Sequence, residues 1–448
     1  MFRSKRIALV LCLLAALGAA VGHAMLSSLQ AVPATRLAPD AAYPDMPADV
    51  RHRYLTVPLD HAAPARGVYR AYYLLGKGFD PAGPVVFFLT DGQMELVSPD
   101  ADASFFDAQL PGLSYVLVGH RGHGPAQFPE VYRGGRTDVA AAMNLYGSWQ
   151  QVEDIERVRQ DMAAHGLLPP DGRIMLFGAS GAGMLVQQYL HRHGGHVSRA
   201  LLATTGAPDL ARLGGRSFAR RLDEFDPRTA AALARRGAAG GVAPDLAYML
   251  FQLGRQGAAG LARYADIVPD TGSAAPLAYA WHWLHPSLNW PLARSLMDAP
   301  AADAVKVRMV ELMGADLKAR AGGSAGGSAG SSSGGNAGGS AGEPLPYAWS
   351  AQVLADFMAA DAPLPDLRLD RARFRGEVLV VAGAQDVVFS PAIGAAIATA
   401  YPDGRFLLVR GGHRLERDPA YQHALRRAFF RHGLHAPQTR ALLAAPPA

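Results

Sequence analysis

Short, continuously apolar segments recur along the chain and are separated by amphipathic ones. Six of them stand out: residues 84–90 (PVVFFLT), 115–119 (YVLVG), 174–178 (IMLFG), 199–205 (RALLATT), 378–383 (VLVVAG) and 406–411 (FLLVRG). Continuous apolarity over this length is typical of strands that are covered on both faces in a parallel sheet. Ahead of them, RYLTVPLDH (53–61) and VYRAYYLLG (68–76) alternate apolar and polar residues, which predicts an antiparallel pair at a sheet edge.

Several of the segments between these predicted strands have the periodicity of amphipathic helices. One helix face is predicted from Val152, Ile155, Val158 and Met162. Ser148 and Gln151 have the spacing of a capping box at the start of that helix, and Gly166 ends it. Asp418 and Pro419 open a later helix that Gly433 ends. Alternating strands and helices predict an α/β fold with a mostly parallel, doubly wound sheet.

Residues 207–365 interrupt this alternation. They are rich in Ala and Arg and mostly helical in pattern, which predicts a helical cap inserted between two parts of the core, 51–206 and 366–435. Inside the cap, residues 321–342 form a Gly/Ser tract that cannot bury enough surface to order itself, so we expect a disordered loop there. The remaining segments are predicted as an N-terminal linker, 25–50, and a C-terminal tail, 436–448.

The first 24 residues have the order of a secretory signal peptide. A basic start is followed by an apolar run from residue 7 to about 22, and Gly22 and Ala24 are small residues at the −3 and −1 positions of a cleavage site. The run is shorter than the roughly 20 residues of a spanning helix, so an uncleaved anchor in the inner membrane is the alternative. We expect an exported protein, periplasmic or secreted, without stable membrane insertion after cleavage. Its only cysteine, Cys12, lies in this segment, so no disulfide is expected.

Composition narrows the classes of function. Half of the 448 residues are hydrophobic and 18% are charged, which favours a well-packed core over disorder. The formal net charge of +5 is small for this length, and no basic stripe with interleaved aromatic residues is present, so nucleic acid is not an expected partner.

The candidate chemistry begins at the turn GASGAG after residues 174–178. Gly178, Ser180 and Ala182 fit a G-x-S-x-G nucleophile elbow with Ala in place of the last glycine. In this turn, small neighbours let a strand and a helix pass closely and expose the serine oxygen. Two alternatives are a dinucleotide-binding turn, although the segment is not G-x-G-x-x-G, and a tight turn with an inert serine.

A serine needs a histidine to take its proton and a carboxylate to orient that histidine. Asp386 follows one predicted strand and His413 follows the next, in the chain order that this architecture uses. Alone, Asp386 could be a turn residue and His413 a surface residue. Together, the three predict a Ser–His–Asp triad. The oxyanion donors are predicted as the backbone N–H of Gly181 and that of Gly92 or Gln93.

These segments resemble the α/β-hydrolase family of prolyl aminopeptidase (proline iminopeptidase) and tripeptidyl aminopeptidase. The resemblance covers roughly residues 50–206 and 375–433 and rests on LTVPLDH, VLVGHRGHGPA, LFGASGAGMLVQQYLHRH, AGAQDVVFSP and RGGHR. It implies Ser180 as nucleophile, Asp386 as the orienting acid and His413 as base. The family's H-G-G-P-G oxyanion loop stands here as T-D-G-Q-M, without the Gly-Pro.

The resemblance implies an aminopeptidase that releases N-terminal residues from short peptides. Such an enzyme binds a substrate ammonium, for which Asp223 and Glu224 are candidates, although the neighbouring arginines favour a self-paired surface. Trp281 and Trp283 could line an apolar substrate pocket or pack within the cap. The alternatives are a carboxylesterase acting on small apolar esters and a non-catalytic envelope protein that keeps the fold. No cofactor is expected. No metal is expected either, because the clustered histidines lack further ligands; these are His120, His123, His191, His193 and His196.

Overall fold

The structure is a computed structural model. It describes residues 38, 46–47, 49–90, 97, 103–123, 127–235, 242–269, 276–324, 344–360, 362–415 and 418–446. The predicted signal peptide and most of the predicted linker lie outside the described residues, as does the Gly/Ser tract from residue 325 on.

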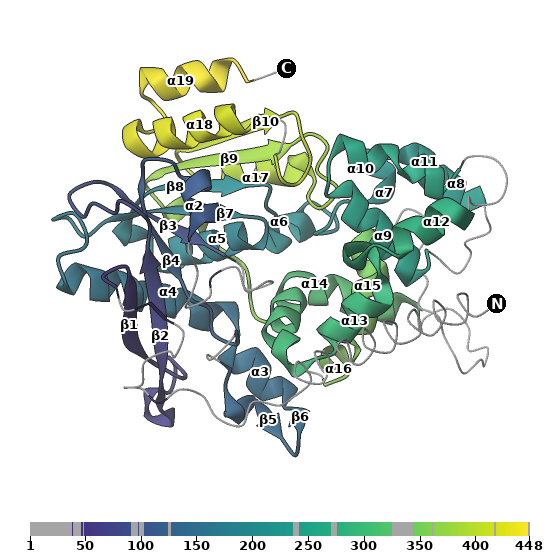
Figure 1. Ribbon diagram of the computed structural model, residues 1–448, viewed down its shortest axis with the longest axis horizontal. Helices are drawn as coiled ribbons and strands as arrows, with labels where there is room; N and C mark the ends of the chain where they lie inside the picture. The colour runs from purple at the N-terminus through teal and green to yellow at the C-terminus, as the bar shows by residue number, and fades with distance from the viewer. Residues whose placement is uncertain are drawn as a thin grey trace, which may run out of the picture.

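An eight-stranded sheet forms the centre of the molecule, in the order β1-β2-β4-β3-β7-β8-β9-β10 (Figure 1). Only β2 runs antiparallel to its neighbours. This order and orientation are those of the α/β-hydrolase fold, and they confirm the predicted edge pair and the positions of all six later strands. The prediction that all six are covered on both faces is wrong for β10, which lies at the other edge of the sheet and has Leu408 46% exposed. The strands are β1 (His52–Pro58), β2 (Val68–Leu75), β3 (Val85–Leu89), β4 (Ser114–Val118), β7 (Ile174–Ala179), β8 (Val197–Ala203), β9 (Glu377–Gly383) and β10 (Gly404–Val409).

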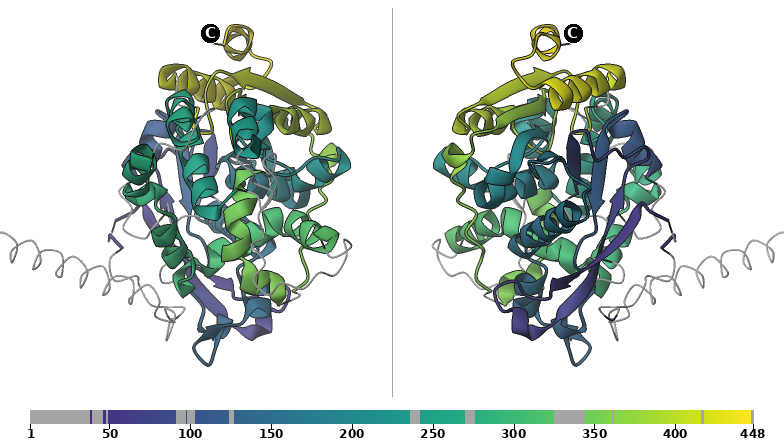
Figure 2. Two further views of the ribbon diagram at one scale, coloured as in Figure 1. Left: turned by 90° about the vertical axis from the view of Figure 1, so that its right-hand side faces the viewer. Right: turned by 90° about the vertical axis from the view of Figure 1, so that its left-hand side faces the viewer.

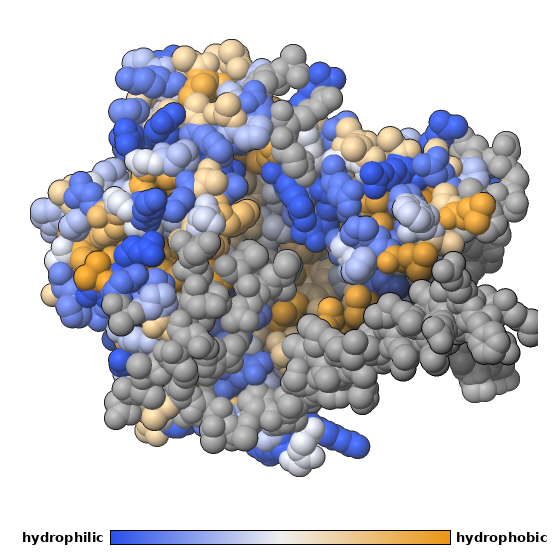
Figure 3. Space-filling model, in the orientation of Figure 1, coloured by the Kyte–Doolittle hydropathy of each residue, from blue (hydrophilic) through white to orange (hydrophobic). Residues whose placement is uncertain are grey.

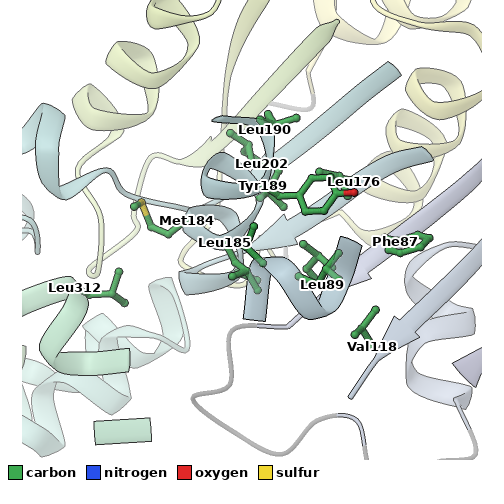
Figure 4. Close-up of a cluster of buried hydrophobic side chains, with 14 of the residues drawn as sticks. Phe87, Leu89, Val118, Leu176, Met184, Leu185, Tyr189, Leu190, Leu202 and Leu312 are labelled. Atoms are coloured by element: carbon green, nitrogen blue, oxygen red, sulfur yellow. The ribbon is translucent and has the colours of Figure 1, made fainter. Parts of the chain in front are cut away.

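Helices cover both faces of the sheet (Figures 1 and 2). Strand β3 shows why its sequence is continuously apolar: Phe87 faces the cluster that contains α4 and α5, whereas Phe88 faces the cluster that contains α2 and α18. Figure 4 shows the first cluster, in which Leu185 and Tyr189 of α5 pack near Leu176. The covering helices are α2 (Ser104–Gln109), α4 (Ser148–Ala164), α5 (Gly181–His193), α17 (Pro391–Ala400), α18 (Pro419–His432) and α19 (Pro437–Ala444), the last within the predicted C-terminal tail.

The chain between β8 and β9 is helical in its described part and has its own small apolar core, which includes Leu250 and Tyr264. Its longest helix, α14, also joins the main core through Val307 and Val310. The helices are α6 (Pro208–Leu213), α7 (Leu222–Phe225), α8 (Pro227–Arg235), α9 (Pro244–Gly254), α10 (Ala258–Ala262), α11 (Tyr264–Ile267), α12 (Pro276–Trp283), α13 (Trp290–Met297), α14 (Asp303–Ser324), α15 (Leu345–Val353) and α16 (Ala355–Ala359).

Smaller elements complete the fold. The chain between β4 and α4 contains the two-stranded pair β5 (Tyr132–Arg133) and β6 (Arg136–Thr137), followed by α3 (Val139–Leu145). Short 3-10 turns are η1 (Pro64–Arg66), η3 (Pro129–Val131), η4 (Gly194–His196), η5 (Pro286–Leu288), η6 (Pro300–Ala302) and η7 (Arg371–Arg373). Among the helices that the structure describes, none is long and apolar enough to cross a membrane.

The predicted capping box at the start of α4 is wrong. The helix begins at Ser148 itself, and the residue before it is Gly147, which has no side chain that could cap the helix. The backbone N–H of Ser148 and its hydroxyl both donate to Glu311 Oε1 of α14, at 2.8 and 3.0 Å. A carboxylate from the cap therefore accepts a free N–H at the start of the helix, the role that was expected of a capping side chain next to it in the sequence. The predicted start and end of α18 are confirmed, because Asp418 accepts from the N–H of Tyr421 and Gly433 follows the last residue.

A buried ion pair ties the β4 end of the sheet to α4. Arg121 donates to the Asp154 carboxylate through Nε and Nη2, at 2.7 and 2.6 Å. The same carboxylate accepts from Tyr69 Oη at 2.7 Å and lies 2.7 Å from His61 Nε2. Burial alone would raise the pKa of Asp154, but the Arg121 charge and these hydrogen bonds hold it below its ordinary value. Both side chains of the pair are buried, so each charge is stabilised by the other rather than by water.

Candidate active site

The elbow at Ser180 connects β7 to α5 in a strained backbone conformation. Ser180 has φ 57° and ψ −130°, a region that residues other than glycine rarely occupy. A Cβ added at Gly178 would lie 2.6 Å from the Ala182 carbonyl oxygen, and one at Gly183 would lie 2.5 Å from Thr205 Oγ1. Glycine at 178 thus lets β7 approach α5 closely, and glycine at 183 lets α5 approach the loop after β8. Ala182, at the place of the motif's final glycine, is buried without such a requirement.

The structure brings the three predicted triad residues together. His413 Nε2 lies 3.0 Å from Ser180 Oγ, and His413 Nδ1 lies 3.0 and 3.1 Å from the two carboxylate oxygens of Asp386. Asp386 follows β9, His413 follows β10, and both side chains are buried. Because an ionised carboxylate only accepts hydrogen bonds, Asp386 selects the tautomer with the proton on Nδ1. This leaves the Nε2 lone pair facing the serine hydroxyl.

The predicted oxyanion donors are only partly within the described structure. Gly181 is the first residue of α5, so its N–H is one of the groups that an α-helix leaves without an intrahelical partner. Gly92 and Gln93 lie outside the described residues. Thr90, which precedes them at the end of β3, is buried with its hydroxyl 2.7 Å from His120 Nε2.

Arg220 holds the loop that carries the acid, a role that no sequence pattern indicated. Its Nη1 donates to the carbonyl oxygen of Asp386 at 2.6 Å and to that of Ala384 at 3.3 Å. The N–H of Val388 donates to Asp386 Oδ1 at 2.7 Å, which fixes the carboxylate itself. Phe389 then packs beside His413, with 5.8 Å between the ring centres. The acid and the histidine are therefore oriented by the strand-end loop and by the first segment of the cap.

The predicted substrate-binding residues lie on or within the cap. Asp223 is exposed on α7 and forms an ion pair of 2.6 Å with Arg221, which lowers the pKa of Asp223. Glu224 is also exposed, with Oε2 3.9 Å from Nε of Arg220. Trp281 is 75% exposed on α12, a region where Figure 3 shows apolar side chains at the surface. Trp283 packs against the core of the cap.

Two of the clustered histidines considered as metal ligands form hydrogen bonds within the protein. His193 lies 3.2 Å from Glu153, and His191 accepts from the N–H of Asp370. A different group, Glu377, Asp403 and His435, brings three potential ligand atoms within 4.8 Å of one another.

That group is already ion-paired. Glu377 accepts from Arg199 Nε at 2.8 Å. Asp403 lies 3.0 Å from His435 Nε2 and raises the pKa of His435.

Acid should destabilise the fold through His120. Burial lowers the pKa of His120 to about 3, whereas an unfolded histidine has a pKa of about 6.5. As the pH falls below about 6.5, the unfolded chain takes up a proton that the folded chain does not, which costs about 1.4 kcal/mol of stability per pH unit. The free energy of unfolding, measured with urea at pH 7 and at pH 5, should decrease between these two pH values. The decrease should be about 2 kcal/mol smaller in His120→Gln than in the unsubstituted protein. An equal loss in both would contradict this, and exposed His165→Gln is the control.

No protein-family model matches the chain. No curated protein matches it significantly in sequence. Similar solved structures include a serine hydrolase from the polyaromatic-hydrocarbon-degrading bacterium Cycloclasticus zankles, which is 14% identical, with 85% of this chain and 98% of that chain covered and a TM-score of 0.40. Another is the 2-hydroxy-6-oxo-6-phenylhexa-2,4-dienoate hydrolase of Rhodococcus sp., 14% identical, with 82% and 95% covered and a TM-score of 0.38.

A third is an esterase from Exiguobacterium antarcticum, 16% identical, with 77% of this chain and 89% of that chain covered and a TM-score of 0.36. Similarities this low do not place the chain in a family. The α/β-hydrolase fold rests on the order and direction of its strands.

Proposed function

We propose that the chain is a serine hydrolase that acts by acyl transfer. The observation that carries the proposal is the hydrogen-bonded series from Asp386 through His413 to Ser180, placed on a strained elbow at the carboxyl end of the sheet. An inert serine in a tight turn would need neither the histidine at 3.0 Å nor the strain. The same series argues against a dinucleotide-binding turn and against a non-catalytic protein that merely keeps the fold.

The geometry supports a two-step mechanism. Ser180 Oγ attacks the substrate carbonyl while its proton passes to His413 Nε2, and the negative charge that forms on the carbonyl oxygen is stabilised by backbone donors including Gly181. The intermediate then collapses, the leaving group takes the proton from His413, and an acyl–Ser180 ester remains. A water molecule gives a proton to His413 and attacks this ester, which releases the acid and restores the serine. Asp386 stays ionised throughout and stabilises the histidine in its charged form.

We propose small apolar esters as the substrate class, in preference to the peptides that the family resemblance implies. An aminopeptidase needs a carboxylate that can bind a substrate ammonium. The two candidates, Asp223 and Glu224, are exposed and already lie against Arg221 and Arg220. Their charges are balanced and screened by water, so neither offers a strong ammonium site.

A panel of three substrates tests this proposal. The protein should hydrolyse p-nitrophenyl butyrate and leave both a free-amine proline p-nitroanilide and its acetylated twin uncleaved. Ser180→Ala should lower the ester rate by at least about 10³-fold, because without the nucleophile only binding and the oxyanion donors remain. Cleavage of the free-amine anilide alone would identify an aminopeptidase and reverse the choice of substrate class. Equal rates of ester hydrolysis in Ser180→Ala and the unsubstituted protein would show that Ser180 is not the nucleophile.

A further inference from the structure

Two consecutive backbone carbonyls of the elbow accept hydrogen bonds from side chains outside it. Thr205 Oγ1 donates to the carbonyl oxygen of Ser180 at 2.6 Å. Arg308 Nη2 donates to the carbonyl oxygen of Gly181 at 3.1 Å. Thr205 comes from the loop after β8, and Arg308 comes from helix α14 of the cap. Neither side chain is part of the hydrogen-bonded series from Asp386 to Ser180.

The first of these bonds acts on the peptide that carries the oxyanion donor. The carbonyl of Ser180 and the N–H of Gly181 belong to one planar peptide unit, so fixing the direction of the oxygen also fixes the direction of the N–H. A hydrogen bond accepted by the carbonyl additionally polarises the N–H on the other side of the unit. Donors of this kind stabilise a developing oxyanion only if they are aimed at it before the reaction starts.

Thr205 is itself held rigidly. The preceding residue, Thr204, has φ 43° and donates its N–H to the carbonyl of Val381 in β9 at 2.7 Å. The following residue, Gly206, accepts a hydrogen bond from Gln187 Nε2 of α5 at 3.1 Å. Thr205 is 3% exposed. A loop fixed on both sides therefore aims the hydroxyl at the Ser180 carbonyl.

Arg308 connects the elbow to the cap through a buried charge pair. Its Nη1 donates to Glu311 Oε2 at 2.8 Å, and the other oxygen of Glu311 accepts from Ser148 at the start of α4. The Nε of Arg308 has no hydrogen-bond partner among the described residues. Arg308 also lines a small pocket with His120 and His123. The second elbow carbonyl is therefore held by a helix that is anchored in both the cap and the core.

We propose that Thr205 is a positioning residue for the oxyanion donor at Gly181, and that Arg308 supports it by holding the next peptide unit. The inference rests on the proposed hydrolase function of the same site. It places part of the transition-state stabilisation in side chains that touch neither substrate nor the reacting atoms.

Thr205→Val removes the hydroxyl but keeps the shape of the side chain. With p-nitrophenyl butyrate, kcat should fall about 10-fold, while KM changes less than about 2-fold. This loss is smaller than the roughly 10²–10³-fold expected when a direct oxyanion donor is removed. Thr205→Ser, which keeps a hydroxyl, should restore kcat to within about 3-fold. The matched control is Thr439→Val, since Thr439 is a fully buried threonine of α19 whose hydroxyl has no partner within the described residues.

Labelling with a fluorophosphonate provides a readout that does not depend on the choice of ester. Ser180 Oγ forms the bond to phosphorus, fluoride leaves, the serine proton passes to His413, and the phosphoryl oxygen occupies the oxyanion position. The labelling rate constant of Thr205→Val should fall in parallel with kcat. A rate equal to that of the Thr439→Val control, or an effect on KM as large as that on kcat, would overturn the role of Thr205. Absence of Ser180 labelling in the unsubstituted protein would instead overturn the proposed function, and the inference with it.

Discussion

Asp386→Asn is expected to lower kcat for ester hydrolysis by about 10⁴-fold, in a protein that still folds. The carboxylate accepts the Nδ1 proton of His413 at 3.0 and 3.1 Å and also the N–H of Val388. An amide can keep the bond to Val388 with its oxygen while its NH₂ group faces His413. The histidine then places its own proton on Nε2, where it can no longer accept the proton of Ser180.

The measurement is kcat from the steady-state release of nitrophenol at pH 7, together with a thermal unfolding curve to show that the variant is folded. Asp366→Asn serves as the matched control, because Asp366 is exposed and, within the described part of the chain, forms its ion pair with the nearby Arg368. The control should keep the full rate. A loss of less than about 10-fold in Asp386→Asn would show that His413 does not depend on this carboxylate for its orientation.

Asp154→Ala is expected to produce the largest loss of stability, about 3–5 kcal/mol in the free energy of unfolding. The substitution leaves Arg121 charged and enclosed, with side chains that are 1% and 2% exposed on the two sides of the pair. It also removes the acceptor of Tyr69 Oη and the partner of His61. Breaking a buried pair costs far more than breaking a surface pair, because water cannot reach the remaining charge.

Urea unfolding at pH 7 measures this effect, with Asp171→Ala as the control. Asp171 is exposed, and its carboxylate accepts the nearby N–H of Arg173. The urea midpoint of Asp171→Ala should therefore equal that of the unsubstituted protein. If Asp154→Ala unfolded at the same urea concentration as the control, the Arg121 guanidinium would have to reach solvent or another acid, contrary to the enclosed geometry.

The parts of the molecule that the sequence predicted are those whose signal is local. Buried parallel strands have continuous apolar sequences because both faces are covered, and a strained elbow needs glycine at Gly178. The order of Ser180, Asp386 and His413 could be predicted because each residue lies in the turn or loop that follows a separate strand, β7, β9 or β10. These features need only a few neighbouring residues to be recognised.

The parts that could not be predicted depend on contacts between distant segments. Ser148 looked like a helix cap, but its partner Glu311 is 163 residues away. Arg220, Thr205 and Arg308 contact the site through single side chains of common residue types, and no spacing distinguishes them from other arginines and threonines. Asp223 and Trp281 were predicted to bind substrate because of the chemistry of their side chains. Their exposure, however, is set by how the cap helices pack.

The pairing of β8 with β9 has a consequence for the order in which the molecule is completed. The two strands are neighbours in the sheet although the whole cap separates them in the chain. His413 meets Ser180 across 233 residues of sequence. Closing so long a loop carries an entropic cost that only the finished contacts repay, which slows folding. During synthesis Ser180 is therefore made long before His413, the base that activates it. The serine stays unactivated until β10 has joined the sheet and brought His413 to it.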